Sequence, residues 1–461
     1  MTDPATTDAL RAAVAAAMPR ALAELTDLVA IPSVSWPAFD QAQVRRSADA
    51  IRELASATGV FEEAAVHTAA IPGTTEHGQP AVLATRSGAP GQRRVLLYAH
   101  HDVQPAGDEA LWVSPPFEAT ERDGRLYGRG AGDDKAGVIT HLAALRVLRE
   151  VLGDDLGLGV TLFVEGEEEY GSRSFGQFLT DHSEALAADL IVVADSGNWD
   201  SRTPGITVTL RGAVRFTLTV RTLAHALHSG MFGGAVPDAM LATIKLLATL
   251  WDDEGAVAVD GLASHDTPTP AYGEDRLREE TDLPQGTRPI GRGELLARIW
   301  NQPSITITGV DYASTAAASN TLHPEVSVVV SARVAPGQDA REAFEALRAH
   351  LVAHAPFGAE LDFSDIDCGQ GFLAADGWGM ELGREALAEG YGVEPVELGV
   401  GGSIPFIADL AEEFPDAAVL VTAVLDPQGS PHSPNESLHL ETFQHAILSE
   451  ALLLARLRDA G

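Results

Sequence analysis

The chain has 461 residues, 45% of them hydrophobic, a formal net charge of −35 and an isoelectric point near 4.6. This length exceeds what one hydrophobic core usually serves, so we expect two domains or one heavily elaborated domain. The negative charge argues against a nucleic-acid partner and against a membrane partner, because phosphates and anionic lipids would repel the protein.

The single cysteine, Cys368, excludes an intrachain disulfide and a zinc cluster made of thiolates. The N-terminal segment lacks a basic region followed by an uninterrupted apolar stretch, and no apolar run is long enough to cross a membrane. We therefore expect a cytoplasmic protein that begins with an amphipathic helix over residues 8–30.

Residues 1–204 predict a mostly parallel sheet covered by helices. Short apolar runs of the buried type alternate with helical segments, an order that suits a parallel α/β arrangement. The expected elements are strands at 94–100, 160–165 and 190–194, helices at 135–152 and 172–180, and a hairpin at 117–127.

The pattern changes near Pro204, where strands of alternating polarity replace the buried runs. Residues 253–290 are polar and rich in Pro and Gly, which predicts a long surface loop. The remaining expected elements are antiparallel strands within 206–221, strands at 304–309, 326–334 and 361–366, and helices at 237–251 and 338–354. This β-α-β-β-α-β order predicts a ferredoxin-like domain over residues 205–377.

The α/β character returns over residues 378–461. We expect helices at 378–391, 404–412 and 441–458, and strands at 396–398 and 418–425. The predicted fold is therefore a two-domain α/β protein. Its catalytic domain consists of residues 1–204 and 378–461, and the ferredoxin-like domain is inserted between them.

Polar side chains follow the first predicted strand, RVLLYA. Open α/β sheets bind ligands at the carboxyl ends of their strands, which is where His100 lies. Asp102 can orient the imidazole of His100 as a carboxylate partner. His101 alternates to the other side, so we expect it to be structural.

A second polar cluster, GAGDDKAG, precedes a predicted helix. Asp133 and Asp134 could simply cap that helix. The flanking glycines and the ammonium group of Lys135 favour a shaped loop with a functional carboxylate instead.

Three further segments carry carboxylates or histidine after apolar runs. Glu167, Glu168 and Glu169 follow TLFVE, and the alternative is a solvated charge run. Adjacent carboxylates can divide their work, because one can bind metal while the next takes a proton from water. Asp195 follows LIVVA and His432 follows AAVLVTAVL, and each taken alone could be a turn residue.

Taken together, these nitrogen and oxygen ligands suit Zn²⁺, with Mn²⁺ or Co²⁺ as alternatives. A charge count favours two ions. Asp133, Glu169 and Asp195 carry three negative charges, and a bridging hydroxide would bring the total to that of two divalent cations. One ion would leave the carboxylates crowded.

The motifs VLLYAHHDVQP, GRGAGDDKAG, EGEEEYGS, HSGMFGG and GGSIPF resemble, in order, those of a metallopeptidase family. This family contains carnosinases, acetylornithine deacetylase, succinyl-diaminopimelate desuccinylase, aminoacylase and carboxypeptidase G. The resemblance covers essentially the whole chain and is strongest to the dipeptidase branch, through DVQP, DDK, HSGxFGG and GGSIP.

The resemblance implies a role for each matching metal ligand. Asp133 would bridge two ions, with His100 and Asp195 completing one site and Glu169 and His432 the other. It also implies a cis peptide bond after the bridging aspartate.

It further implies catalytic and substrate-binding roles. Glu168 would be the general base, and Asp102, which orients the imidazole of His100, would also belong to the catalytic residues. His228 would stabilise the oxyanion from the partner subunit of a homodimer formed through the inserted lid domain. Arg333 would bind the substrate carboxylate. The other substrate contacts would be Asn320, Gly401 and Ser403.

We therefore predict a two-metal dipeptidase for short peptides with a free carboxylate. An N-acyl amino acid amidohydrolase and a carboxypeptidase share the same chemistry and stay open as alternatives. A non-catalytic metal-binding scaffold is a more distant alternative, since the chain retains the base and every ligand.

Overall fold

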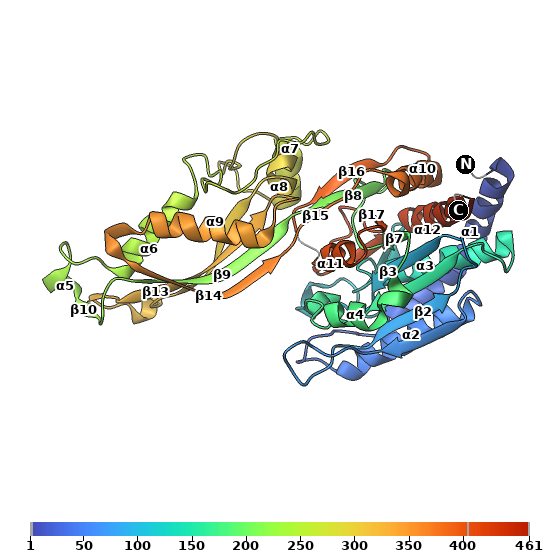
Figure 1. Ribbon diagram of the computed structural model, residues 1–461, viewed down its shortest axis with the longest axis horizontal. Coiled ribbons are helices and arrows are strands. Elements are labelled where there is room, and N and C mark those ends of the chain that lie inside the picture. The colour runs from blue at the N-terminus through green and yellow to red at the C-terminus, as the bar shows by residue number, and fades with distance from the viewer. Residues whose placement is uncertain (1–2, 403–404, 460–461) are drawn as a thin grey trace. The chain divides into compact units, whose positions relative to one another are not determined.

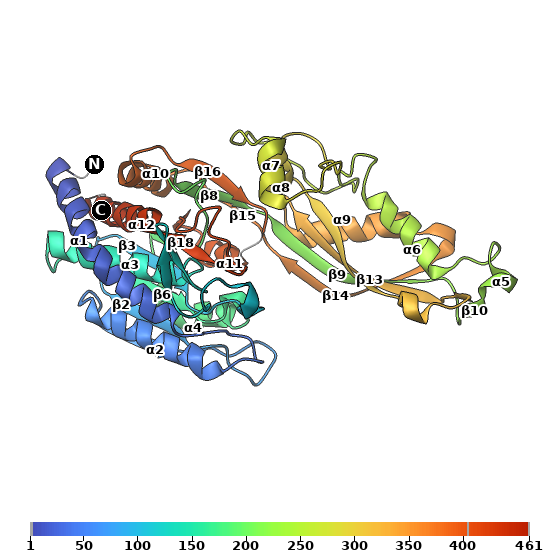
Figure 2. The ribbon, with the colours of Figure 1, turned by 180° about the vertical axis from the view of Figure 1, so that it is seen from behind.

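A computed structural model describes residues 3–402 and 405–459 (Figures 1 and 2). The contacts between residues divide the chain into two units. The first unit comprises Met1–Thr207, Ala374–Leu398 and Asp409–Gly461, and the second comprises Val208–Leu373 and Gly399–Ala408. The second unit is thus inserted in the first and also takes a short segment from within residues 378–461.

The main sheet has nine strands with the order β1-β2-β6-β3-β7-β17-β8-β15, in which β16 also pairs with β8. Most of it belongs to the first unit, while β15 and the last residues of β8 and β16 are assigned to the second. Strands β6, β3, β7 and β17 run parallel to one another. The apolar runs of β3, β6 and β7 are buried almost throughout, as a sheet covered on both faces requires. The strands are β1 (Glu63–His67), β2 (Ala81–Arg86), β3 (Arg94–His100), β6 (Gly159–Glu165), β7 (Leu190–Val193), β8 (Gly205–Leu210), β15 (Phe372–Leu373), β16 (Val396–Val400) and β17 (Ala418–Val421).

Helices cover this sheet, which confirms the predicted α/β class. Helices α1, α3, α10 and α12 pack together as one layer, while α2 packs on β1 and β2, and α4 packs on β6. The helices of this unit are α1 (Pro4–Val29), α2 (Gln41–Ala57), α3 (Lys135–Leu152), α4 (Phe175–Leu186), α10 (Trp378–Tyr391) and α12 (Leu440–Asp459). Helix α11 (Pro405–Glu413) begins in the second unit and ends in the first. A small separate sheet contains β4 (Thr120–Arg122), β5 (Arg125–Tyr127) and β18 (Ser437–His439).

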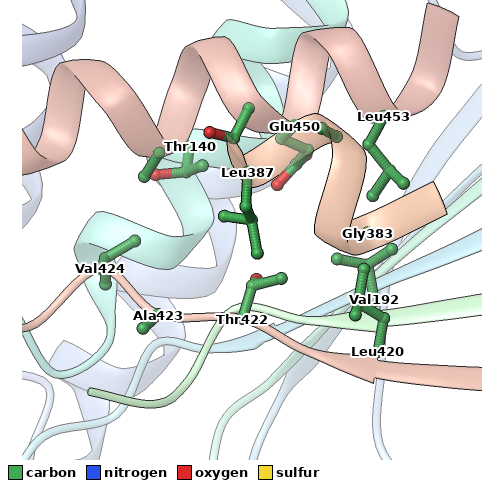
Figure 3. Close-up of a pocket in the computed structure, with 13 residues that line it drawn as sticks. Thr140, Val192, Gly383, Leu387, Leu420, Thr422, Ala423, Val424, Glu450 and Leu453 are labelled. Carbon is green, nitrogen blue, oxygen red and sulfur yellow. The ribbon is translucent and has the colours of Figure 1, made fainter. Parts of the chain in front are cut away.

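A cavity of about 20 Å³ lies in the core of the first unit, between helices α3, α10 and α12 and strands β7 and β17 (Figure 3). Its walls are mostly apolar, and Thr140 and Glu450 contribute polar atoms. This volume suits about one water molecule. The cavity is therefore a packing feature of the core and is too small for a substrate.

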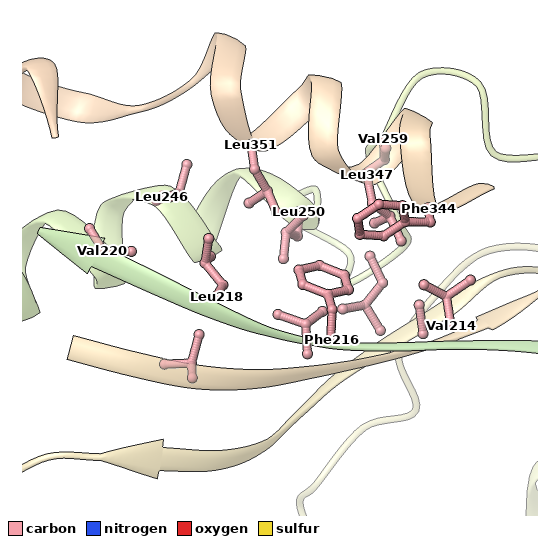
Figure 4. Packing of buried hydrophobic residues seen from close by; sticks show 14 of the residues in the cluster. Val214, Phe216, Leu218, Val220, Leu246, Leu250, Val259, Phe344, Leu347 and Leu351 are labelled. Atoms are coloured by element: carbon pink, nitrogen blue, oxygen red, sulfur yellow. The ribbon is translucent and has the colours of Figure 1, made fainter. Parts of the chain in front are cut away.

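The second unit has a four-stranded antiparallel sheet with the order β11-β13-β9-β14. Counted along the chain, this order is 2-3-1-4, and helices α6 and α9 pack on the sheet, as in a ferredoxin-like domain. Phe216, Leu246 and Phe344 are among the side chains that fill the core between them (Figure 4). The elements are β9 (Gly212–Arg221), α6 (Ala239–Leu247), β11 (Ser304–Asp311), β13 (Glu325–Val334), α9 (Ala340–Ala353) and β14 (Glu360–Gly369).

Shorter elements complete the second unit. A ribbon of β10 (Leu227–His228) and β12 (Thr321–Leu322) leads into α5 (Ser229–Phe232). The prediction of one long loop over residues 253–290 was wrong, because α7 (Glu274–Thr281) lies within it, followed by α8 (Leu295–Trp300). Helix α7 buries no side chain and is supported by ion pairs between residues four apart, so it has no apolar periodicity that would reveal it.

None of the helices in the described part of the chain combines the length and the apolar composition that crossing a membrane requires.

Candidate metal centre

Three predicted site segments meet at one edge of the main sheet. His100 ends β3 and lies opposite Glu165 at the end of the parallel strand β6. Tyr98 lies opposite Val193 at the end of β7, two residues before Asp195. Because these strands are parallel and in register, their carboxyl ends bring the following polar residues to the same edge.

Asp133 reaches this edge from the loop that precedes α3. The buried carboxylate of Glu436 holds that loop, since it accepts hydrogen bonds from the backbone N–H groups of Gly130, Gly132 and Asp133 at 3.0–3.1 Å. The guanidinium of Arg129 donates to the same carboxylate at 2.6 Å. Sequence reasoning missed Glu436, although it stands in the segment SPHSPNE that contains His432.

The ligand atoms form two sets that share Asp133. One carboxylate oxygen of Asp133 lies 3.2 Å from Nε2 of His100, and the other lies 3.0 Å from Nε2 of His432. Asp195 lies 3.9 Å from the same His100 nitrogen, and Glu169 lies 3.3 Å from the His432 nitrogen. Within each set the ligand atoms lie within 4.8 Å of one another. The structure thus brings all five predicted metal ligands together.

These residues fit divalent metal ions by their chemistry. Imidazole nitrogens and carboxylate oxygens are ligands of Zn²⁺, Mn²⁺ and Co²⁺. Hydrogen bonds to Asp133 and Glu169 raise the pKa of His432 to about 10, which shows how strongly this cluster attracts positive charge. The peptide bond between Asp133 and Asp134 is cis, as the resemblance implied.

Asp102 contacts both a predicted metal ligand, His100, and the turn that carries the predicted general base, Glu168. Its carboxylate accepts hydrogen bonds from the backbone N–H groups of Glu168 and Glu169, each at 3.1 Å, and from the hydroxyl of Ser35 at 2.7 Å. Its carbonyl oxygen lies 3.1 Å from Nδ1 of His100. Asp102 therefore orients an imidazole ligand and fixes the turn that carries the glutamates.

Glu168 lies at this turn, where burial raises the pKa of its carboxyl to about 7. His100 opposes that shift, while the carboxylates of Glu169, Asp102 and Asp133 add to it. A carboxyl with a pKa near neutrality can both accept and return a proton.

Two neighbouring residues have roles that the sequence only hinted at. Gln104, in the motif DVQP, donates a hydrogen bond of 2.7 Å to the carboxylate of Glu169. Lys135 is fully buried, and its ammonium donates to the carbonyl oxygens of Leu28 and Ile31 at the end of α1. This explains the ammonium at position 135, because it ties the loop of Asp133 to the first helix.

His101 instead lies 2.8 Å from the carbonyl oxygen of Pro80, as a structural residue would.

The other predicted site residues belong to the second unit. His228 is exposed on β10, opposite Thr321, and the backbone N–H of Ser229 donates to the carbonyl oxygen of Asn320 at 3.0 Å. The paired ribbon therefore brings His228 and Asn320 together.

Arg333 is half-buried on β13, and Gly401 accepts a hydrogen bond from the guanidinium of Arg211. Ser403 lies outside the described residues.

The comparison with protein families decides the class of the protein. A protein-family model described as peptidase family M20/M25/M40 matches residues 96–456 of the sequence. The chain belongs to this family. It is therefore a peptidase, a hydrolase of peptide bonds, and the family resemblance predicted from the motifs is confirmed.

Relatives in this family carry dipeptidase names. The chain is 34% identical to a cysteinylglycine-S-conjugate dipeptidase from Corynebacterium striatum, over 78% of this chain and 80% of the relative. It is 28% identical to a Cys-Gly metallodipeptidase from Schizosaccharomyces pombe, over 92% of each chain. The structure of human carnosine dipeptidase 1 matches with a TM-score of 0.76 and 23% identity over 99% of each chain, which establishes the shared fold.

Proposed function

We propose that this peptidase is a dipeptidase that uses two divalent metal ions. The observation that carries the proposal is Asp133, whose two carboxylate oxygens each face a different histidine-containing ligand set. A shared carboxylate of this kind suits two adjacent ions better than one. Dipeptides are proposed as substrates because the relatives named above are dipeptidases.

Bound metal ions would polarise the scissile carbonyl and lower the pKa of the attacking water. Glu168 is the proposed general base, which takes a proton from that water and later delivers it to the leaving amine. Its pKa of about 7 suits both transfers, and the hydrogen bond from its backbone to Asp102 holds the turn in place. Zn²⁺ is the proposed metal, and Mn²⁺ and Co²⁺ share its ligand preferences.

The residues of the second unit are proposed to act on the substrate. His228 would stabilise the oxyanion, and Arg333 would bind the substrate carboxylate, in keeping with the motifs around them. Asn320, Gly401 and Ser403 are proposed as further substrate contacts.

We also propose a homodimer formed through the second unit. Leu241 and Ile244 of α6 and Val310 of β11 are large apolar side chains that are 47%, 59% and 53% exposed. Exposed apolar surface of this kind is typical of protein interfaces. Mixing the impaired His228→Ala and Glu168→Gln subunits tests the arrangement, because recovered activity requires that His228 serve the partner's centre. The cytoplasmic location and the lack of nucleic-acid and membrane partners stay predictions from the sequence.

The experiment that tests the function measures amine release from dipeptides, longer peptides and N-acyl amino acids, first after chelation and then after adding Zn²⁺, Mn²⁺ or Co²⁺. Metal-dependent cleavage of dipeptides supports the proposal and ranks the metals. Cleavage of N-acyl amino acids alone would make the protein a deacylase, and cleavage only of longer peptides at the carboxyl end would make it a carboxypeptidase. No cleavage with any metal would contradict the proposal and favour a metal-binding scaffold.

A further inference from the structure

Arg211 is a buried arginine in the second unit, between β8 and β9, and is only 8% exposed. Its Nε donates to the carbonyl oxygen of Gly401 at 2.9 Å. Its Nη1 donates to the carbonyl oxygen of Gln302 at 3.2 Å and to the hydroxyl of Ser304 at 3.1 Å. All three acceptors are neutral, so these bonds hold the guanidinium in place without neutralising its charge.

None of the ion pairs between described residues includes Arg211. The exposed Arg221 on β9 shows the usual arrangement, since it pairs with Glu325 at 2.7 Å. Burying a charge away from water is costly unless an opposite charge accompanies it. Burial lowers the pKa of Arg211 to about 10, and the nearby Arg333 acts in the same direction. The group nevertheless stays charged at neutral pH, so its surroundings favour an incoming anion.

Strand pairing places Arg333 on the same side of the sheet. Arg333 of β13 lies directly opposite Ser304 of β11 in an antiparallel pair. Directly opposed residues project their side chains to the same face. Arg211 donates to the hydroxyl of that same Ser304, so its guanidinium lies on the face of the sheet to which Arg333 projects.

Gly401 packs closely against this group. A Cβ atom at Gly401 would lie 3.2 Å from Nη2 of Arg211 and 3.1 Å from the carbonyl oxygen of Ile299. Any larger residue would therefore press on the guanidinium. The glycine allows the backbone of the GGSIP motif to approach Arg211 directly.

We propose that Arg211 is a specificity-determining residue, the second cation of a two-arginine site for the carboxylate of the peptide substrate. It supplies positive charge beside Arg333 and positions the backbone at Gly401. The inference rests on the proposed function, in which Arg333 binds that carboxylate. It adds a selection for free peptide acids over peptides whose carboxyl end is amidated.

The test compares KM for one dipeptide and for its carboxamide, in wild type and in Arg211→Met, with the metal that gives the best wild-type activity. We expect wild type to prefer the acid, and Arg211→Met to reduce the ratio of the two KM values about tenfold. Arg211→Lys keeps the charge and should retain part of the preference. Arg221→Met, on the same sheet, is the matched control and should leave the ratio unchanged.

The KM ratio does not depend on the fraction of enzyme that is folded, so a loss of stability in Arg211→Met cannot imitate the expected result. An unchanged ratio in Arg211→Met would overturn the inference and make Arg211 a structural residue. If wild type cleaves no dipeptide, the proposed function fails by itself. Calorimetric titration with the same acid and amide then decides the inference: selective binding of the acid that Arg211→Met abolishes would support it, and equal binding would overturn it.

Discussion

The two groups of site residues differ in how the protein holds them. In the first unit, His100 and Asp133 are buried, and Asp102 and Glu436 bind the backbone and side chains around them. In the second unit, His228 is exposed on a two-residue strand. Metal ligands must keep their geometry closely, so a packed sheet edge suits them. The comparison predicts that changes at the metal ligands of the first unit alter metal content, whereas changes at the site residues of the second unit alter only the kinetics.

The largest effect is expected at Asp133, because both ligand sets share it. Asp133→Ala should remove both metal ions and abolish measurable peptide cleavage. Metal analysis of the purified variant by mass spectrometry tests this, with Asp27→Ala on the exposed face of α1 as control. Retention of one ion at full occupancy would contradict a shared ligand.

Glu168 should separate chemistry from metal binding within the first unit. Glu168→Gln should keep both ions but lower kcat by about 10²–10⁴-fold, since it removes a general base and keeps the shape of the side chain. Parallel measurements of kcat and metal content test this, with the exposed Glu121→Gln as control. Near-normal turnover would remove Glu168 as the base.

His228 tests whether site residues of the second unit affect the kinetics without affecting metal content. His228→Ala should lower kcat by about 10²-fold through the loss of one oxyanion donor, with metal content unchanged. His265→Ala, an exposed histidine of the same unit, is the matched control. Loss of metal in His228→Ala would break the proposed division between the units.

The smallest expected effect is on the pH dependence of stability. In the first unit, His141 is buried, with Nδ1 2.9 Å from the carboxylate of Glu450 and Nε2 2.9 Å from the carbonyl oxygen of Tyr98. Burial lowers the pKa of His141, but Glu450, the carbonyl oxygen of Tyr98 and Asp134 together outweigh it, so the net shift is upward. In the second unit, burial and His354 lower the pKa of His350.

The pKa values of His141 and His350 shift in opposite directions, so their contributions to the free energy of unfolding should change with pH in opposite directions. The stability from His141 is fully present below its unfolded pKa, near 6.5, and is lost as the pH rises through its raised folded pKa. The free energy of unfolding lost in His141→Gln should therefore be largest at pH 6 and shrink as the pH rises through the raised folded pKa of His141. In His350→Gln the loss should instead shrink as the pH falls below 6.5. Urea denaturation across this range tests both, and equal slopes would contradict the two shifts.

Local patterns in the sequence were enough to predict much of the fold and the composition of the metal centre. The predicted helix at 135–152 and strand at 94–100 agree with α3 and β3, because apolar periodicity and glycine boundaries act over a few residues. The parallel strand order predicted that polar groups after the strands would share one edge. His100, Asp133, Glu169, Asp195 and His432 do lie together there.

Tertiary structure decided the contacts between distant segments. Glu436 lies about three hundred positions from the loop of Asp133 that it holds, and Lys135 reaches the end of α1 about a hundred positions away. The setting of Arg211 likewise depends on Ser304 and Gly401, which come from separate segments. Residue types and periodicity specify which local element forms and which chemistry it can carry. Which residues hold those groups and shift their pKa values depends on how the elements pack. The sequence does not reveal these contacts, because contacts between distant segments leave no local periodic signal.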